Sequence, residues 1–221
     1  MTLLDYPGRV ACTVFLGGCD FRCPFCHNYE LVEGPLPAAM SEEEFFAFLH
    51  KRRGLLDGVA ITGGEPCLRK DLPEFLASIH EAGFDVKLDT NGNHPHMLEH
   101  VLKNGLVDYV AMDIKNSPAK YARTIGVLDI DLEPIRESVG LLMASGVPYE
   151  FRTTVVRELH EAEDFERIGE WINGAERYFL QAFTQGSAVP DSSLTEPDSA
   201  ALLLFRDISA RYVKHVEVRG V

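Results

Sequence analysis

The chain has 221 residues, 46% of them hydrophobic, and its 34 acidic and 21 basic side chains give a formal net charge of −13. This length and apolar content are typical of one globular domain and argue against a disordered chain. The acidic balance argues against a nucleic-acid surface, which needs clustered Lys and Arg. We find no apolar run of about 20 residues, as a membrane span requires, and no signal-peptide pattern at the start. We therefore expect a soluble cytoplasmic protein that binds neither nucleic acid nor membrane.

Strand-like apolar runs alternate with helical patterns, which is typical of βα units and a parallel sheet. The expected strands cover residues 10–16, 58–62, 84–88, 107–114, 149–156 and 178–182, and a seventh candidate covers 215–218. Of the expected helices, one begins at the capping box of Ser41 and Glu44, one runs from Asp71, as its cap, to Gly83, and four cover 95–103, 132–144, 161–173 and 196–212. Six units are too few for a closed eight-fold barrel, and no G-x-G-x-x-G turn follows the first strand. The predicted fold is an α/β partial (β/α)6 TIM-like barrel formed by residues 1–221 as one domain.

Three of the five cysteines lie within eight residues, in the C-x3-C-x2-C run of Cys19, Cys23 and Cys26. An odd number of cysteines in a chain without an export signal argues against a disulfide framework. Three thiolates on one loop can bind three irons of a cubane cluster and leave the fourth iron open for a reactant. The alternative is a zinc site with His27 as the fourth ligand, but His27 directly follows Cys26, so binding of one ion by both is sterically awkward.

The ends of the other predicted strands also carry elements that suit a ligand site. These are Gly63-Gly64-Glu65-Pro66, Asp89-Thr90-Asn91-Gly92, Met112-Asp113-Ile114-Lys115 and Phe151-Arg152-Thr153-Thr154-Val155-Val156. Each alone reads as a turn or a surface charge. Because chemistry in such folds gathers at the carboxyl ends of the strands, we expect them to surround the cysteine loop.

This set of elements resembles the radical S-adenosylmethionine (SAM) superfamily. Cys19, Cys23, Phe25 and Cys26 match its cysteine signature, and residues 63–66 match its GGEP element. The resemblance implies a partial barrel of the radical SAM type, a 4Fe-4S cluster on the three cysteines, and SAM as the second cofactor. The residues that we assign to cofactor binding are Phe25, His27, Gly63, Gly64, Glu65, Pro66, Asp89, Thr90, Asn91, Asp113, Lys115, Arg152, Val155 and Gln181.

The chemistry of SAM suggests individual roles for these residues. Lys115 and Arg152 suit its carboxylate, and Glu65 with the backbone of residues 63–64 suits its ammonium group. Asp113 suits the ribose hydroxyls, and Phe25 with residue 155 or 156 suits the adenine. The resemblance further implies a monovalent cation at Asp89, Asp113 and the carbonyls of Thr90 and Ala111.

Within the superfamily the chain is similar to the glycyl-radical-enzyme activases, and most of all to the activating proteins of anaerobic ribonucleoside-triphosphate reductase. This implies a glycyl radical enzyme as protein substrate and a flavodoxin or ferredoxin as electron donor. Asp5, Pro7 and Gly8 match an element that contacts the target protein in formate-lyase-type activases, although Pro-Gly is equally common as a simple turn. Gln181 and Tyr29 depart from the pattern, because formate-lyase-type activases place histidine at the first position and the closest pattern places proline at the second.

Two other functions remain open. One is a small radical SAM enzyme that acts on a metabolite or peptide, such as a carboxydeazaguanine synthase, and the other is an iron–sulfur electron carrier. Among the residues outside the motifs, Cys67 follows the GGEP element at the expected rim of the site. His94, His96 and His100 are expected on one solvated helix face rather than at a metal.

Overall fold

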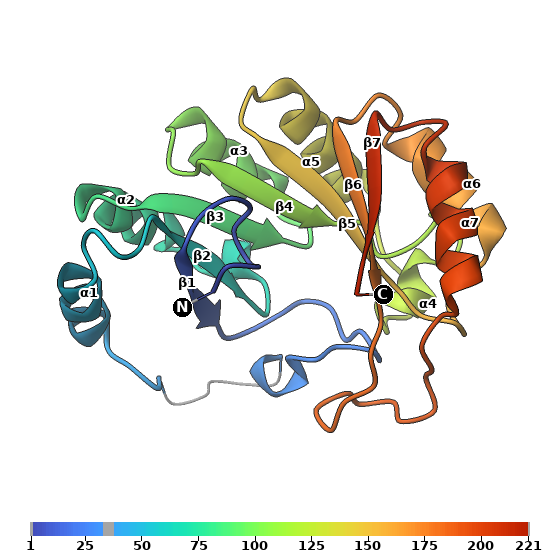
Figure 1. The fold of residues 1–221 in the computed structure, drawn as a ribbon, viewed down its shortest axis with the longest axis horizontal. Helices are drawn as coiled ribbons and strands as arrows, with labels where there is room; N and C mark the ends of the chain where they lie inside the picture. Colours follow the sequence, from blue (N-terminus) through green and yellow to red (C-terminus); the bar gives the residue numbers. More distant parts are fainter. Residues whose placement is uncertain (1, 33–37, 221) are drawn as a thin grey trace.

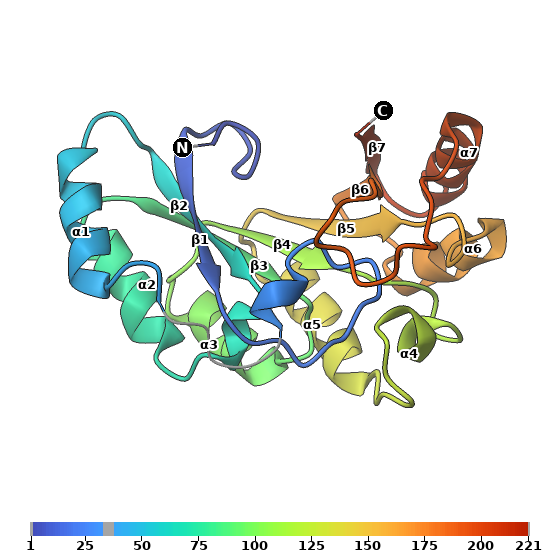
Figure 2. The same cartoon turned by 90° about the horizontal axis from the view of Figure 1, so that it is seen from below.

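The computed structural model describes residues 2–32 and 38–220. Its centre is one sheet of seven parallel strands in chain order, drawn in Figure 1. The strands are β1 (Ala11–Leu16), β2 (Gly58–Gly63), β3 (Asp85–Thr90), β4 (Tyr109–Asp113), β5 (Tyr149–Val155), β6 (Arg177–Ala182) and β7 (His215–Arg219). β1 and β7 are the two edges of the sheet, which Figure 2 shows as an open arc. The predicted partial barrel is therefore confirmed, and the seventh candidate strand forms its last edge.

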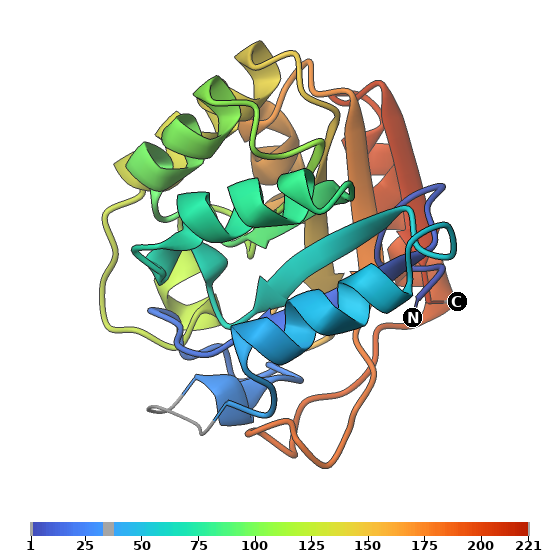
Figure 3. The same cartoon turned by 90° about the vertical axis from the view of Figure 1, so that its left-hand side faces the viewer.

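Helices follow the strands and cover the outer face of the sheet, as Figure 3 shows for the side of α1 to α3. They are α1 (Glu42–Lys51), α2 (Leu72–Glu81), α3 (Pro95–Lys103), α4 (Tyr121–Thr124), α5 (Glu133–Ala144), α6 (Ala162–Trp171) and α7 (Ser199–Ser209), with 3-10 turns at Tyr29–Leu31 and Pro66–Leu68. The four-residue α4 was not predicted, because one turn is too short to show helical periodicity. None of these helices is long and apolar enough to cross a membrane.

A side-chain cap is found at the start of α1 but not at the start of α2. At α1, the Ser41 hydroxyl accepts a hydrogen bond from the Glu44 amide, and the Glu44 carboxylate accepts one from the Ser41 amide, as the capping box predicts. Asp71 occupies the cap position of α2, but its carboxylate pairs with Arg69 instead of the helix amides. The predicted side-chain cap at Asp71 is therefore wrong, because the nearby guanidinium is the stronger partner.

Successive side chains of each strand point to opposite faces of the sheet, so core residues and pocket residues alternate along the strand. Val86 and Leu88 of β3 and Met112 of β4 are fully buried between sheet and helices. Asp89 and Asp113, which directly follow Leu88 and Met112, face the inside of the arc. The outer face thus supplies the hydrophobic core, and the inner face is left for polar chemistry.

Candidate active site

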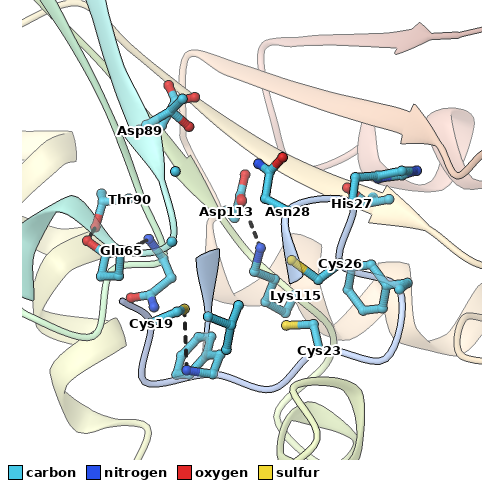
Figure 4. Close-up of a pocket in the computed structure, with 18 of the residues that line it drawn as sticks. Cys19, Cys23, Cys26, His27, Asn28, Glu65, Asp89, Thr90, Asp113 and Lys115 are labelled. Atoms are coloured by element: carbon cyan, nitrogen blue, oxygen red, sulfur yellow. Dashed lines mark hydrogen bonds and ion pairs between the residues drawn. The ribbon is translucent and has the colours of Figure 1, made fainter. Parts of the chain in front are cut away.

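A pocket lies at the carboxyl ends of the strands, where Figure 4 shows the cysteine loop and the strand ends facing the same space. It is lined by Cys19, Phe21, Cys23, Phe25, Cys26, His27, Asn28, Val32, Thr62, Gly63, Gly64, Glu65, Asp89, Thr90, Asn91, Asp113, Lys115, Arg152 and Thr154. Side chains from the ends of β2, β3, β4 and β5 thus share a wall with the loop that follows β1. The expected convergence of the motifs on one pocket is observed.

The cysteine loop is tied to its surroundings by backbone hydrogen bonds. The amide of Gly18 donates to the carbonyl of Leu31 at 2.7 Å, and the amide of Arg22 donates to that of Ile125 at 2.8 Å. The Arg22 guanidinium returns to the loop and donates to the Cys19 carbonyl at 2.6 Å. The loop is therefore tied to its surroundings on both sides of Cys19, at Gly18 and at Arg22.

The thiols on this loop have the chemistry that a cluster needs. Cys19, Cys23 and Cys26 are all free, and the sulfur of Cys19 accepts a hydrogen bond from the Phe21 amide at 3.4 Å. Burial raises the pKa of Cys19 to about 11 and that of Cys23 to about 12, so both carry a proton at neutral pH until a metal displaces it. Each cysteine of a cubane binds a different iron. Among the described residues, no group of three or more His, Cys, Asp or Glu side chains is arranged to hold one metal ion.

A row of alternating charges crosses the inner face of β3, β4 and β5. The Nε of Arg152 lies 2.9 Å from Oδ1 of Asp113, and the Nζ of Lys115 lies 2.8 Å from Oδ2 of the same carboxylate. Arg152 also lies 3.4 Å from Asp89, which in turn pairs with Lys87. The row holds three cations and two anions, and the Glu65 carboxylate lies on the same pocket wall.

The electrostatics of this row keep Asp113 and Lys115 ionised. Burial alone would raise the pKa of Asp113, but the charges of Arg152 and Lys115 outweigh it and lower that pKa to about 2. Burial would lower the pKa of Lys115, yet the neighbouring Asp113 carboxylate raises it instead. Both cations thus stay charged at any ordinary pH, as recognition of a carboxylate requires.

The two glycines of the GGEP element allow close contact between chain segments. A Cβ at Gly64 would lie 2.0 Å from the carbonyl oxygen of Gly18, and one at Gly63 would lie 2.2 Å from that of Leu16. Gly63 also has a φ of +124°, a conformation that side chains rarely adopt. The glycines therefore let the end of β2 lie directly against the cysteine loop.

Glu65 connects the same element to the end of β3. Its buried carboxylate accepts hydrogen bonds from the amides of Cys67 and Asn91, at 2.9 and 2.6 Å, and from the Thr90 hydroxyl at 2.8 Å. Cys67 is itself buried, and burial together with the Glu65 charge raises the pKa of its thiol. The structure therefore gives Glu65 a bracing role on the pocket wall and leaves Cys67 as a protonated thiol behind it.

Not all of the predicted site residues line this pocket. Pro66 is buried at the start of a 3-10 turn, Val155 is packed in the helix-facing core, and Gln181 lies beside Arg219 in the sheet. The pocket also contains residues that the sequence analysis did not assign to cofactor binding, namely Phe21, Asn28, Val32, Thr62 and Thr154. Thr154 follows Arg152 by two positions, so strand alternation could have indicated it.

The segment of Asp5, Pro7 and Gly8 lies apart from the pocket, beside β1. The Asp5 carboxylate accepts a hydrogen bond from the Thr13 hydroxyl at 2.7 Å. Between these residues, Tyr6 is buried against Tyr109, with ring centroids 6.1 Å apart. The segment is thus anchored at the edge strand.

The sequence pattern of the radical SAM superfamily matches residues 13–172. The chain belongs to the radical SAM superfamily. A Methanocaldococcus jannaschii protein, named as a candidate glycyl-radical enzyme activating enzyme, is 32% identical over the whole chain and 93% of its own length. A 7-carboxy-7-deazaguanine synthase of Thermococcus kodakarensis is 31% identical over 51% of this chain and 52% of its own. A pyruvate formate-lyase-activating enzyme of Clostridium pasteurianum is 34% identical over 52% of this chain and 50% of its own.

The fold of this radical SAM protein is also that of solved structures. Streptococcus suis SuiB bound to S-adenosylmethionine superposes with a TM-score of 0.74 at 15% identity, over 96% of this chain and 50% of that one. At 15% sequence identity, this superposition shows a common fold and nothing further. The family pattern covers the cysteine loop and the ends of β2 to β5, so the pocket lies within the matched region.

Proposed function

We propose that this chain is a glycyl-radical-enzyme activase. It would cleave SAM reductively at a 4Fe-4S cluster, and the resulting 5′-deoxyadenosyl radical would take a hydrogen atom from a glycine Cα of a partner protein. The observation that carries the proposal is one pocket in which three thiols face the paired side chains of Arg152, Asp113 and Lys115. The similarity to the candidate activating enzyme of M. jannaschii, which extends over the whole chain, supports the activase function.

The cysteine loop and the strand ends would divide the cofactor work. Cys19, Cys23 and Cys26 would bind three irons, which leaves the fourth iron for the amino-acid moiety of SAM. When bound, the cluster would supply the electron that breaks the bond between the sulfonium and C5′ and releases methionine. Lys115 and Arg152 would bind the SAM carboxylate, because they are the Lys and Arg side chains that line the pocket.

The remaining SAM contacts follow from the residues on the same wall. The backbone of residues 63–64 would accept from the ammonium group, close to the Glu65 carboxylate. Asp113 would meet the ribose and Phe25 the adenine. A monovalent cation at Asp89 and Asp113 stays a prediction, and it would have to share carboxylates that already pair with Lys and Arg.

We propose anaerobic ribonucleotide reductase as the glycyl radical partner and a flavodoxin or ferredoxin as the electron donor, both in the cytoplasm. The sequence resemblance to activating proteins of that reductase supports the first choice. Asp5, Pro7 and Gly8 would contact the partner's glycine loop, which could approach the inner face of the sheet through the gap between β1 and β7.

A radical SAM enzyme acting on a metabolite is the second candidate. The similarity to the T. kodakarensis 7-carboxy-7-deazaguanine synthase favours it, although that match covers only half of this chain.

Glycyl radical formation separates the two candidates. We would mix the reduced, cluster-loaded protein with SAM and the purified anaerobic reductase of the same genome and record electron paramagnetic resonance. An activase gives a glycyl radical doublet on the reductase, and the Cys23→Ala variant gives none. If SAM is cleaved but no glycyl radical forms on the reductase or on any other glycyl radical enzyme of the genome, the metabolite enzyme is the better account.

A further inference from the structure

Asp20, the residue directly after the first cysteine, makes an unusual number of side-chain contacts. Its carboxylate accepts hydrogen bonds from Nδ2 of Asn91 at 2.8 Å, from Nδ2 of Asn93 at 2.6 Å and from Nε2 of His94 at 3.1 Å. The same carboxylate lies 3.9 Å from the sulfur of Cys19. All three donors belong to the single connection between β3 and α3.

That connection is itself firmly held. The amide of Asn91 donates to the buried Glu65 carboxylate, and the hydroxyl of Ser138 in α5 donates to the carbonyl of Gly92 at 2.7 Å. His94 is the cap residue of α3, so its ring projects from the start of a helix. The donors that meet Asp20 therefore stand on a rigid part of the barrel rather than on a free loop.

We propose that Asp20 is a positioning residue, which fastens the Cys19 end of the cysteine loop to the β3–α3 connection through Asn91, Asn93 and His94. This inference deepens the proposed function, because it concerns how the cluster loop is held in place before iron binds.

The chemistry of the contact suits this role. An ionised carboxylate with three donors is a strong anchor, since charge-assisted hydrogen bonds are roughly twice as strong as neutral ones. The sulfur of Cys19 contacts the Phe21 amide at 3.4 Å and the Asp20 carboxylate itself at 3.9 Å. Its position therefore depends on the neighbouring residue.

His94 does not lie on a solvated helix face, as the sequence suggested, because its ring contacts the Asp20 carboxylate at the start of α3. The His94 side chain is 27% exposed, and that of Asp20 is 23% exposed, so the pair is largely shielded from water. Glutamine at position 94 could still present an Nε donor to the carboxylate, whereas alanine could not. This difference supplies a conservative variant for the test.

Hydrogen exchange of the iron-free protein, followed by mass spectrometry, tests the proposal without any cluster activity. We expect Asp20→Asn and His94→Ala to speed amide exchange in residues 17–28 by at least tenfold, with exchange in β5 and β6 unchanged. His94→Gln should stay within about threefold of the parent protein. Asp71→Asn, which removes a carboxylate paired with Arg69 outside the site, is the matched control and should change nothing in this segment.

A second measurement tests whether the same variants lose iron faster than the parent protein. After reconstitution, Asp20→Asn and His94→Ala should lose iron to a chelator at least fivefold faster than the parent protein, and His94→Gln should lose it at the parent rate. Unchanged exchange in residues 17–28 of Asp20→Asn and His94→Ala would overturn the proposal. So would an equal rise over the whole chain, or a His94→Gln protein that behaves like His94→Ala. None of these readouts needs SAM cleavage, so failure of the activase function would be seen separately.

Discussion

Arg152 and Asp113 are register partners on β5 and β4, and the Nε of Arg152 lies 2.9 Å from Oδ1 of Asp113. Parallel pairing thus places a guanidinium and a carboxylate side by side at the inner end of the sheet. Each has a second partner of opposite charge, Asp89 for Arg152 and Lys115 for Asp113. Because Lys115 and Arg152 both line the pocket, an incoming carboxylate can pair with either of them.

Removal of Arg152 should weaken SAM binding and leave iron binding intact. Arg152→Ala is expected to lower SAM affinity by about 10- to 100-fold, since a charge-assisted contact of about 1.4 to 3 kcal/mol is lost. Equilibrium dialysis with labelled SAM and an iron assay on the same sample measure both quantities. Arg167→Ala is the matched control, because Arg167 pairs only with exposed glutamates of α6. An Arg152→Ala protein that binds SAM normally would contradict the assignment of the row.

Loss of one cluster cysteine should abolish both the absorption of the cluster and the cleavage of SAM. Cys23→Ala is expected to lose the visible absorption of the cluster and all SAM cleavage, because two thiolates cannot hold the cubane. Cys67→Ala is the control, since its buried thiol lies behind the pocket wall and should leave iron content unchanged. Absorption spectra and iron analysis after anaerobic reconstitution provide the comparison. Retained cleavage in Cys23→Ala would refute the cluster assignment.

A methyl group at position 64 should disturb the cysteine loop. In Gly64→Ala the new Cβ would lie 2.0 Å from the carbonyl oxygen of Gly18, so the loop must move. We expect at least a twofold lower iron content after reconstitution. Gly140→Ala in α5 has nothing within 4 Å and should raise the free energy of unfolding by about 0.5 to 1 kcal/mol. Equal iron content in the two variants would show that the close approach of the loops is not required.

His160 should make stability depend on pH. Its Nδ1 accepts a hydrogen bond from the Val156 amide, its Nε2 donates to the Lys115 carbonyl, and burial lowers its pKa below the usual 6.5. Below about pH 6.5, His160 binds a proton in the unfolded chain but stays neutral when buried in the native state. The free energy of unfolding therefore falls by up to about 1.4 kcal/mol per pH unit. Urea unfolding of the parent and of His160→Gln at pH 7.5, 6.5 and 5.5 measures this. The advantage of the parent should shrink toward pH 5.5, and a constant difference would contradict the prediction.

Much of this architecture could be predicted from the sequence, because strand ends and cysteine spacing are local signals. β1 to β7 and the grouping of their terminal motifs follow from alternating apolar runs and the rule that parallel strands end at one side. The position of Val155 could also be predicted from strand alternation. Since Arg152 faces the pocket, strand alternation turns Thr154 to the same side and Val155 to the core. The contact between Asp20 and His94 joins residues 74 positions apart, and nothing in the local pattern of either predicts it.

The most direct measurement of the central claim is 5′-deoxyadenosine, quantified by mass spectrometry after anaerobic reconstitution and addition of SAM and dithionite. We expect 5′-deoxyadenosine and methionine in equal amounts, with none from Cys23→Ala. Absence of both products from protein with a full complement of iron and sulfide, tested with and without the anaerobic reductase, would contradict SAM cleavage by this chain.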